Sequence, residues 1–140
     1  IAAFKELPEF PAESSAILCR HVLMQALPAA AERDLKSFGE AIQALQMMTG
    51  DYFAPAQGGA RYTSPLVAQV LTVLQQNGVH CFGQSSWGPT GFAVFENHQQ
   101  AEMQLQQLRN KFSAQSNAQF ANLKFELTRV NNEPSRLKVS

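Results

Sequence analysis

The densest concentration of residues suited to chemistry is the stretch 83–91, which holds three glycines, one proline and two serines. Glycine tolerates positive φ and lets the backbone approach a ligand closely. Consecutive backbone N–H groups, helped by two hydroxyls, can form an anion-binding concavity. A hairpin turn that packs a tryptophan explains the same composition, and composition alone favours the turn. The candidate residues are Gly83, Gln84, Ser85, Ser86, Trp87, Gly88 and Thr90.

A second candidate site is the loop before a helix that Ser64 and Pro65 are expected to begin. This loop contains the pair Gly58 and Gly59, followed by Arg61. Helix N-termini attract anions, and an arginine can add a bidentate contact to a phosphate. A flexible linker with a solvated arginine is an equally good interpretation of the same residues.

Geometry excludes two other kinds of site. The 83–91 stretch is not a Gly-x-Ser-x-Gly nucleophile elbow, because Trp87 stands at the last glycine position and a strand is expected to follow. A zinc site would need two Cys–His pairs whose members point to opposite sides of a helix or strand. These pairs are Cys19 with His21 and His80 with Cys81. We therefore expect no metal site, and we expect both cysteines to act as small buried hydrophobic residues.

Composition sets the class of the protein. The chain has 140 residues, and eleven Lys and Arg balance eleven Asp and Glu. This balance argues against a nucleic-acid partner, which requires clustered excess cation. No apolar run of about eighteen residues is present, so we expect no membrane span. Two cysteines are too few for a disulfide scaffold, which favours a reduced, cytoplasmic setting.

Apolar periodicity predicts four helices that must position the two candidate loops. Ser14 or Ser15 should cap the first helix, whose apolar residues cover more than one face and indicate burial on both sides. Pro28 should end it and open a second helix, with Gly50 just past the end. The unfavourable Gly39 inside this second helix, which costs about 1 kcal/mol, indicates a close approach by another segment. The expected helices are 15–27, 28–48, 65–77 and 97–112.

A change of period after Gly78 predicts strands at 79–82 and 90–95, and alternation predicts a third at 123–128. The sum is an α+β domain over residues 1–130, with helices on one face of a small antiparallel sheet. A strand upstream of Ile1 would complete a four-stranded sheet. Residues 131–140 are expected to be a flexible tail.

The stretch Gly83–Thr90, GQSSWGPT, resembles the glycine-rich C-terminal motif of β-ribofuranosylaminobenzene 5′-phosphate synthases, a branch of the GHMP kinase superfamily. The resemblance covers most of residues 1–130. It extends upstream through Phe4–Pro11, Leu27-Pro28-Ala29 with Asp34, Phe38-Gly39, Tyr52-Phe53 and Gln57–Gly59.

The resemblance implies a ferredoxin-like GHMP C-terminal domain whose phosphate-loop partner, the N-terminal domain, is absent from this chain. Such synthases condense phosphoribosyl pyrophosphate with 4-hydroxybenzoate or 4-aminobenzoate, releasing carbon dioxide and pyrophosphate, in tetrahydromethanopterin biosynthesis. Mg²⁺ is expected for the full-length enzyme and no cofactor for this part. A homodimer is left open. The alternatives are a GHMP-type small-molecule kinase, whose relatives carry small residues at the position of Trp87, and a non-catalytic ligand-binding domain of the same fold.

Carried over to this chain, the resemblance implies that residues 83–88 border the substrate cleft. Backbone N–H groups of Gly83, Ser85, Ser86 and Gly88 would contact the phosphoribosyl ligand. Gln84 or Trp87 would support the loop or touch the aromatic acid, and the Gly58-Gly59 loop would face the same cleft. No residue is an obvious general base, so electrostatic positioning is expected to matter more.

Overall fold

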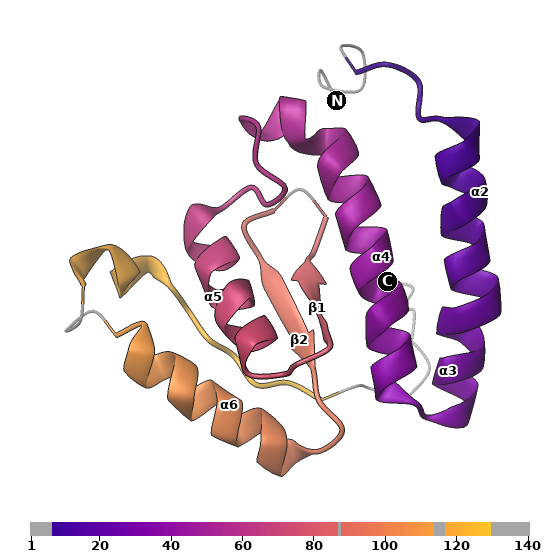
Figure 1. Cartoon of the computed structure of the whole chain (residues 1–140). Helices are drawn as coiled ribbons and strands as arrows, with labels where there is room; N and C mark the ends of the chain where they lie inside the picture. Colours follow the sequence, from indigo (N-terminus) through magenta and orange to yellow (C-terminus); the bar gives the residue numbers. More distant parts are fainter. Residues whose placement is uncertain (1–6, 87, 114–116, 130–140) are drawn as a thin grey trace, which may run out of the picture.

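A computed structural model describes residues 7–86, 88–113 and 117–129. Its architecture is α+β with a small antiparallel sheet, as the sequence predicts, but in the described residues the sheet has two strands rather than three (Figure 1). The helices are α2 (Ala12–His21), α3 (Leu27–Glu32), α4 (Leu35–Phe53), α5 (Pro65–Gln76) and α6 (His98–Lys111). Shorter helical segments are the π-helical η1 (Val22–Ala26) and the 3-10 segments η2 (Ala54–Gln57) and η3 (Ala118–Asn122). Among the described residues, no helix combines the length and apolarity needed to cross a membrane.

The first helical segment differs from the prediction at both ends. It begins at Ala12 after Pro11 rather than at Ser14 or Ser15. It does not end at Pro28, because η1 continues directly into α3, whose first turn accommodates the proline. The break comes at Arg33, whose φ of 61° is left-handed. The single helix predicted over 28–48 is therefore two helices.

The outer side of this first segment is exposed. Leu23, Met24 and Leu27 are 61, 69 and 56% exposed, whereas Ala26 and Ala29 are buried. All three parts of the segment contact α4. The prediction that its apolar residues are buried on both sides is therefore wrong for the described residues, since α4 covers one side only.

Helix α4 begins at a capped N-terminus and runs further than expected. Asp34 accepts hydrogen bonds from the Ser37 hydroxyl at 2.6 Å and the Ser37 N–H at 3.0 Å, and these bonds lower the pKa of Asp34. The helix continues past Met48 to Phe53, so Gly50 lies inside it and is not its C-terminal cap.

Strands β1 (Cys81–Gln84) and β2 (Gly91–Val94) form the hairpin, with Cys81 opposite Val94 and Gln84 opposite Gly91. The strand predicted at 79–82 is therefore displaced by two residues. The segment predicted as a strand at 123–128 lies outside the sheet. Its alternation instead reflects burial, since Leu123 and Phe125 pack against the core. The N-caps Ser64 and Asn97 are confirmed.

One face of the hairpin supplies the hydrophobic core. The cross-strand neighbours Phe82 and Ala93 point to the same face, and α5 and α6 pack against it. The buried members of this core are Val67, Val70, Leu71, Leu74, Phe82, Leu108 and Phe112. The proposed tail at 131–140 lies outside the described residues.

Helix α4 closes the other edge of β1. Ser85 N–H donates to the Thr90 carbonyl at 2.8 Å, so the alternation of an antiparallel ladder directs the backbone groups of Phe82 and Gln84 away from β2. Gln43 Nε2 donates to the Phe82 carbonyl, and Gln46 makes hydrogen bonds with both backbone groups of Gln84, at 2.9 and 3.2 Å. Two glutamine side chains thus take the place of a neighbouring strand.

The close approach predicted at Gly39 is confirmed. A Cβ at this position would lie 2.7 Å from the His80 carbonyl carbon and 2.8 Å from the Cys81 nitrogen. These are backbone atoms next to β1, and they cannot rotate away as a flexible side chain could. Gly39 therefore permits α4 to lie directly against the start of the strand.

We predict that Gly39→Ala destabilises the domain, even though alanine in a helix is more favourable than glycine by about 1 kcal/mol. Overpacking against the backbone should outweigh that gain and leave a net loss of about 1–3 kcal/mol. Urea unfolding followed by circular dichroism measures the change. Glu40→Ala, at the neighbouring exposed position, is the control and should change stability by less than about 0.5 kcal/mol. A Gly39→Ala variant as stable as the wild type would contradict the predicted contact.

Candidate functional site

The two loops singled out in the sequence meet at one cavity of about 300 Å³. The last turns of α4 form one wall, and the segment around η2 and the residues following β1 form the others. The lining residues are Gln46, Thr49, Gly50, Phe53, Gln57, Arg61, Gln84 and Ser86.

One row of residues on α4 leads into this cavity. Gly39, Gln43, Gln46 and Gly50 follow the spacing i, i+4, i+7 and i+11, which places them on one side of the helix. The first three contact β1 or the residue before it. A Cβ on Gly50 would overlap Arg61 Cγ, so this glycine makes room for the arginine stem. The same row therefore docks the helix and forms the cavity wall.

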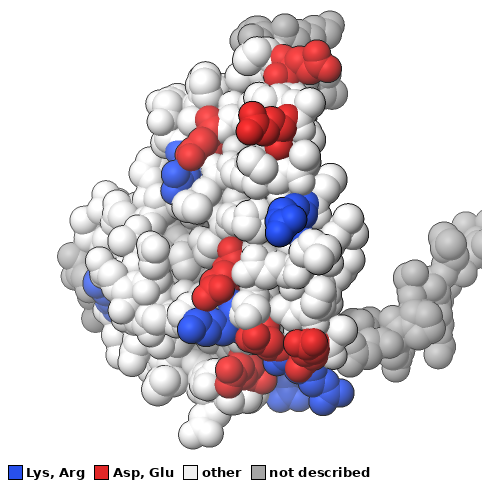
Figure 2. Space-filling model, turned by 45° about the vertical axis from the view of Figure 1, so that its right-hand side comes forward, with Lys and Arg blue, Asp and Glu red and all other residues white. Residues whose placement is uncertain are grey.

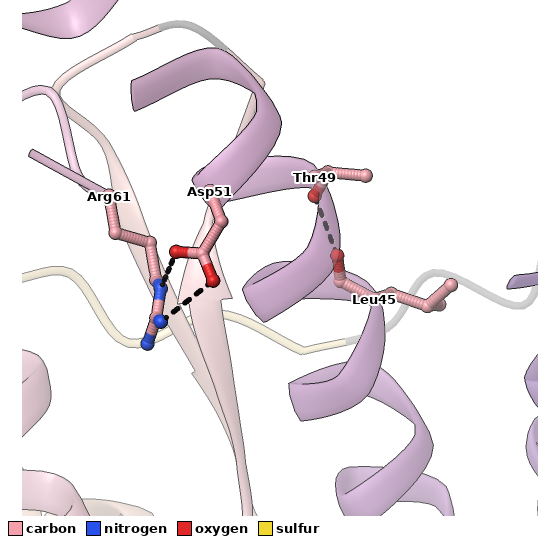
Figure 3. Close-up of polar contacts among 4 residues, drawn as sticks. All are labelled: Leu45, Thr49, Asp51 and Arg61. Atoms are coloured by element: carbon pink, nitrogen blue, oxygen red, sulfur yellow. Dashed lines mark hydrogen bonds and ion pairs between the residues drawn. The ribbon is translucent and has the colours of Figure 1, made fainter. Parts of the chain in front are cut away.

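Arg61 is held in place by an ion pair with Asp51. Its Nε and Nη2 donate to the two carboxylate oxygens of Asp51 at 2.8 and 3.1 Å (Figure 3). The hydrogen bond with Asp51 raises the pKa of Arg61. Because the side chains are 40 and 60% exposed, water screens the pair, and such pairs contribute at most about 1 kcal/mol. The pair orients the guanidinium without binding it tightly.

A nearly buried amide connects the two loops. The Gln84 side chain accepts a hydrogen bond from the Thr63 N–H at 2.6 Å and donates to the Ser86 carbonyl at 2.8 Å. It also donates to Gln57 Oε1 across a longer 3.4 Å. Gln57 Oε1 accepts a further bond from the Thr63 hydroxyl at 2.6 Å. Gln84 thus fixes the loop before α5 to the turn after β1.

Both loops contain backbone in the left-handed region. Gly58 and Gly59 have φ of 73° and 84°, and a Cβ on either would meet no atom within 4 Å. Their conformation, rather than crowding, therefore calls for glycine. Ser86 has φ of 53° without that freedom, and its carbonyl accepts the bond from Gln84. The buried amide helps to hold this uncommon conformation.

The cavity contains some of the predicted site residues and not others. Gln84, Ser86 and Arg61 line it, whereas Gly58, Gly59, Gly83, Ser85, Gly88 and Thr90 do not. The Ser85 N–H is bonded to Thr90 within the hairpin. A side chain at Gly83 would overlap that of Gln46, so this glycine serves the docking of α4. Trp87 lies outside the described residues.

The cavity wall supplied by α4 has no counterpart among the predicted site residues. Gln46, Thr49 and Phe53 line the cavity, but the apolar stripe that predicts the helix does not include its polar row. The available signal was the spacing of Gly39, Gln43, Gln46 and Gly50, in which two helix-disfavoured glycines flank two amides.

Among the described residues, no three His, Cys, Asp or Glu side chains cluster in a way that could hold a metal ion. Cys81 is buried, as predicted, and burial raises the pKa of its thiol. The prediction for Cys19 is wrong, since this cysteine is exposed on α2.

A comparison with protein families identifies the domain. The family described as GHMP kinases C terminal matches residues 26–114, which is more than half of the chain. The chain belongs to this family. No curated protein and no solved structure matches it. Within this GHMP kinase C-terminal domain, the matched range contains the whole cavity wall from Gln46 to Ser86.

We predict that Gln84→Glu destabilises the domain in a pH-dependent way. The carboxylate would keep an acceptor for the Thr63 N–H but face the Ser86 carbonyl and Gln57 Oε1 without a proton to donate. Burial and these oxygens should raise its folded-state pKa above the unfolded value of about 4.3. The loss, about 1–3 kcal/mol at neutral pH, should therefore shrink as pH falls and the carboxyl takes up a proton.

Urea unfolding at several pH values between mildly acidic and neutral measures this effect. Gln69→Glu, an equal charge change at an exposed position of α5 away from its C-terminus, should show little loss and little pH dependence relative to the wild type. Equal stability of the two glutamate variants at every pH would show that the Gln84 amide does not hold the loops together.

Proposed function

We propose that this GHMP kinase C-terminal domain is part of a cytoplasmic β-ribofuranosylaminobenzene 5′-phosphate synthase of tetrahydromethanopterin biosynthesis. The observation that carries the proposal is the single cavity lined by Gln57 and by Gln84 and Ser86. These residues belong to two of the segments that resemble the synthases, Gln57–Gly59 and Gly83–Thr90. The two segments are separate in the sequence, yet both resemble the synthases and both line the cavity. We therefore expect them to bind the same ligand.

In the proposed reaction, a ring carbon of 4-hydroxybenzoate or 4-aminobenzoate bonds to C1 of phosphoribosyl pyrophosphate. Pyrophosphate leaves with the electrons of the broken C1–O bond, and carbon dioxide leaves the ring. The described residues that line the cavity include no carboxylate and no histidine, so their side chains can orient ligands but offer no general base. We assign the domain a binding and positioning role, with an N-terminal domain as the partner that supplies the rest of the active site.

A second candidate follows from the family match itself. GHMP kinases transfer a phosphoryl group, and the matched family does not separate such a kinase from a synthase. The cavity suits either reaction, because both use phosphorylated ligands. A non-catalytic ligand-binding domain is the third candidate, and it would show neither reaction.

Assays of the complete natural protein discriminate these candidates. With phosphoribosyl pyrophosphate and either benzoate, we expect equimolar release of carbon dioxide and pyrophosphate, and no benzoate-independent consumption of ATP. The 140-residue chain alone should release neither product. Phosphoryl transfer from ATP to a small molecule, without condensation, would favour the kinase and refute the synthase.

We predict that the double substitution of Ser85 and Ser86 by alanine lowers kcat/KM of the complete protein by about 10-fold or more, equivalent to about 1.4 kcal/mol of transition-state stabilisation. Ser86 lines the cavity, whereas the Ser85 backbone is bonded within the hairpin. Thermal unfolding should be nearly unchanged. The matched control replaces Ser14 and Ser15 on α2 by alanine and should retain wild-type kinetics. Wild-type kinetics in the Ser85/Ser86 variant would leave the loop with a purely structural role.

A further inference from the structure

The oxygen and the nitrogen of the Gln84 and Gln57 side-chain amides can be told apart by starting from one backbone N–H donor. The Thr63 N–H can only donate, so the Gln84 atom that receives it at 2.6 Å is the amide oxygen. Gln84 Nε2 is therefore the donor toward Gln57, and the Gln57 atom that receives this bond is Oε1. Gln57 Oε1 also accepts from the Thr63 hydroxyl. The amide nitrogen of Gln57 is left with no hydrogen-bond partner among the described residues.

Two more donors remain at the cavity after the internal bonds are made. Asp51 occupies Nε and Nη2 of Arg61 and leaves Nη1 (Figure 3). The Ser86 hydroxyl has no partner in the described part of the chain. The other polar lining groups are engaged, because both amide atoms of Gln46 bind the Gln84 backbone and the Thr49 hydroxyl donates to the Leu45 carbonyl.

We infer that this cavity binds an oxyanion, the carboxylate or phosphate end of a ligand. Its donors would be Gln57 Nε2, Arg61 Nη1 and the Ser86 hydroxyl. Among the described lining residues, donors are in excess and there is no carboxylate, which makes an acceptor-rich group the complementary ligand. The ring of Phe53 lines the same cavity and suits the apolar body to which that group is attached. The inference rests on the proposed function for its choice of ligands, since both substrates of the synthase carry such a group.

Asp51 is a positioning residue in this arrangement. Its carboxylate orients the guanidinium but also places a negative charge beside the anion site. The charges on the visible surface are similarly mixed, with acidic and basic side chains adjacent to one another (Figure 2), so that face provides no extended field of one sign to attract an anion. Recognition must therefore come from the local donors. Asp51→Asn keeps one acceptor for Arg61 and removes the charge, so it should tighten anion binding a few-fold.

The test is a titration of the ¹⁵N-labelled 140-residue chain, followed by the side-chain amide signals of Gln57 and Gln84 and the Nε signal of Arg61. The probes are inorganic phosphate, 4-hydroxybenzoate and the neutral 4-hydroxybenzyl alcohol. At least one anion should shift these signals with a millimolar dissociation constant, and the neutral alcohol should not. Phosphate alone would identify the phosphoribosyl end, and 4-hydroxybenzoate alone would identify the aromatic acid.

Gln57→Glu is the decisive variant, because it keeps the acceptor for Thr63 and Gln84 and replaces only the free donor with an oxygen. It should weaken anion binding by about 10-fold or more, as should Arg61→Gln. Gln107→Glu is the matched control, since Gln107 Oε1 likewise accepts a bond, from Asn77, on the exposed side of α6. Its binding should equal that of the wild type.

The inference is overturned if neither anion binds at tens of millimolar, if the neutral alcohol binds equally well, or if Gln57→Glu and Gln107→Glu bind alike. Because the titration involves no reaction, its outcome is independent of the condensation assay. Anion binding without condensation would refute the synthase and leave the oxyanion site standing. Condensation without anion binding at these residues would refute the oxyanion site and leave the synthase standing.

Discussion

The hydrogen bonds between α4 and the outer edge of β1 are the interaction on which the rest of the domain depends. Because α4 covers this edge of β1 and β2 occupies the other, the Phe82 carbonyl and the backbone groups of Gln84 would be buried without partners if α4 packed there in another rotation. Each unsatisfied group would cost about 1–3 kcal/mol. The amide of Gln43 satisfies the Phe82 carbonyl, that of Gln46 satisfies both backbone groups of Gln84, and only one rotation of the helix aligns both amides. The position of α4, and with it the cavity wall, follows from that requirement.

Glycines make the contact between α4 and β1 possible, and a further glycine on the same row of α4 lies at the cavity. Gly39 admits the backbone of His80 and Cys81, and Gly83 admits the side chain of Gln46. Further along the same row, Gly50 admits the stem of Arg61. A helix with larger residues at these places would stand away from the strand and break its bonds with Gln84. Close packing and the placement of the cavity's arginine are thus consequences of one arrangement.

Local sequence patterns predict the helices and the hairpin. Contacts between residues far apart in the sequence determine how these helices and strands pack. The caps Ser64 and Asn97 and the crowding at Gly39 could be predicted because each depends on neighbouring residues or on a broken local rule. The alternation after Leu123 predicts a strand, and that prediction is wrong because the alternation reflects burial rather than pairing. The roles of Gln43 and Gln46 could not be predicted, because their partners lie almost forty residues away and are backbone atoms without a sequence signature.

The two walls of the cavity are held by different kinds of contact, and this difference determines how a ligand would be bound. The α4 wall is fixed by backbone contacts with β1. The opposite wall depends on the exposed pair of Arg61 with Asp51 and on the amide of Gln84, which holds both Thr63 and Ser86. Because one side chain holds both loops, displacement of either strains the bonds of the other. A ligand that engages Gln57 or Ser86 would therefore order the two loops together, while α4 keeps its place.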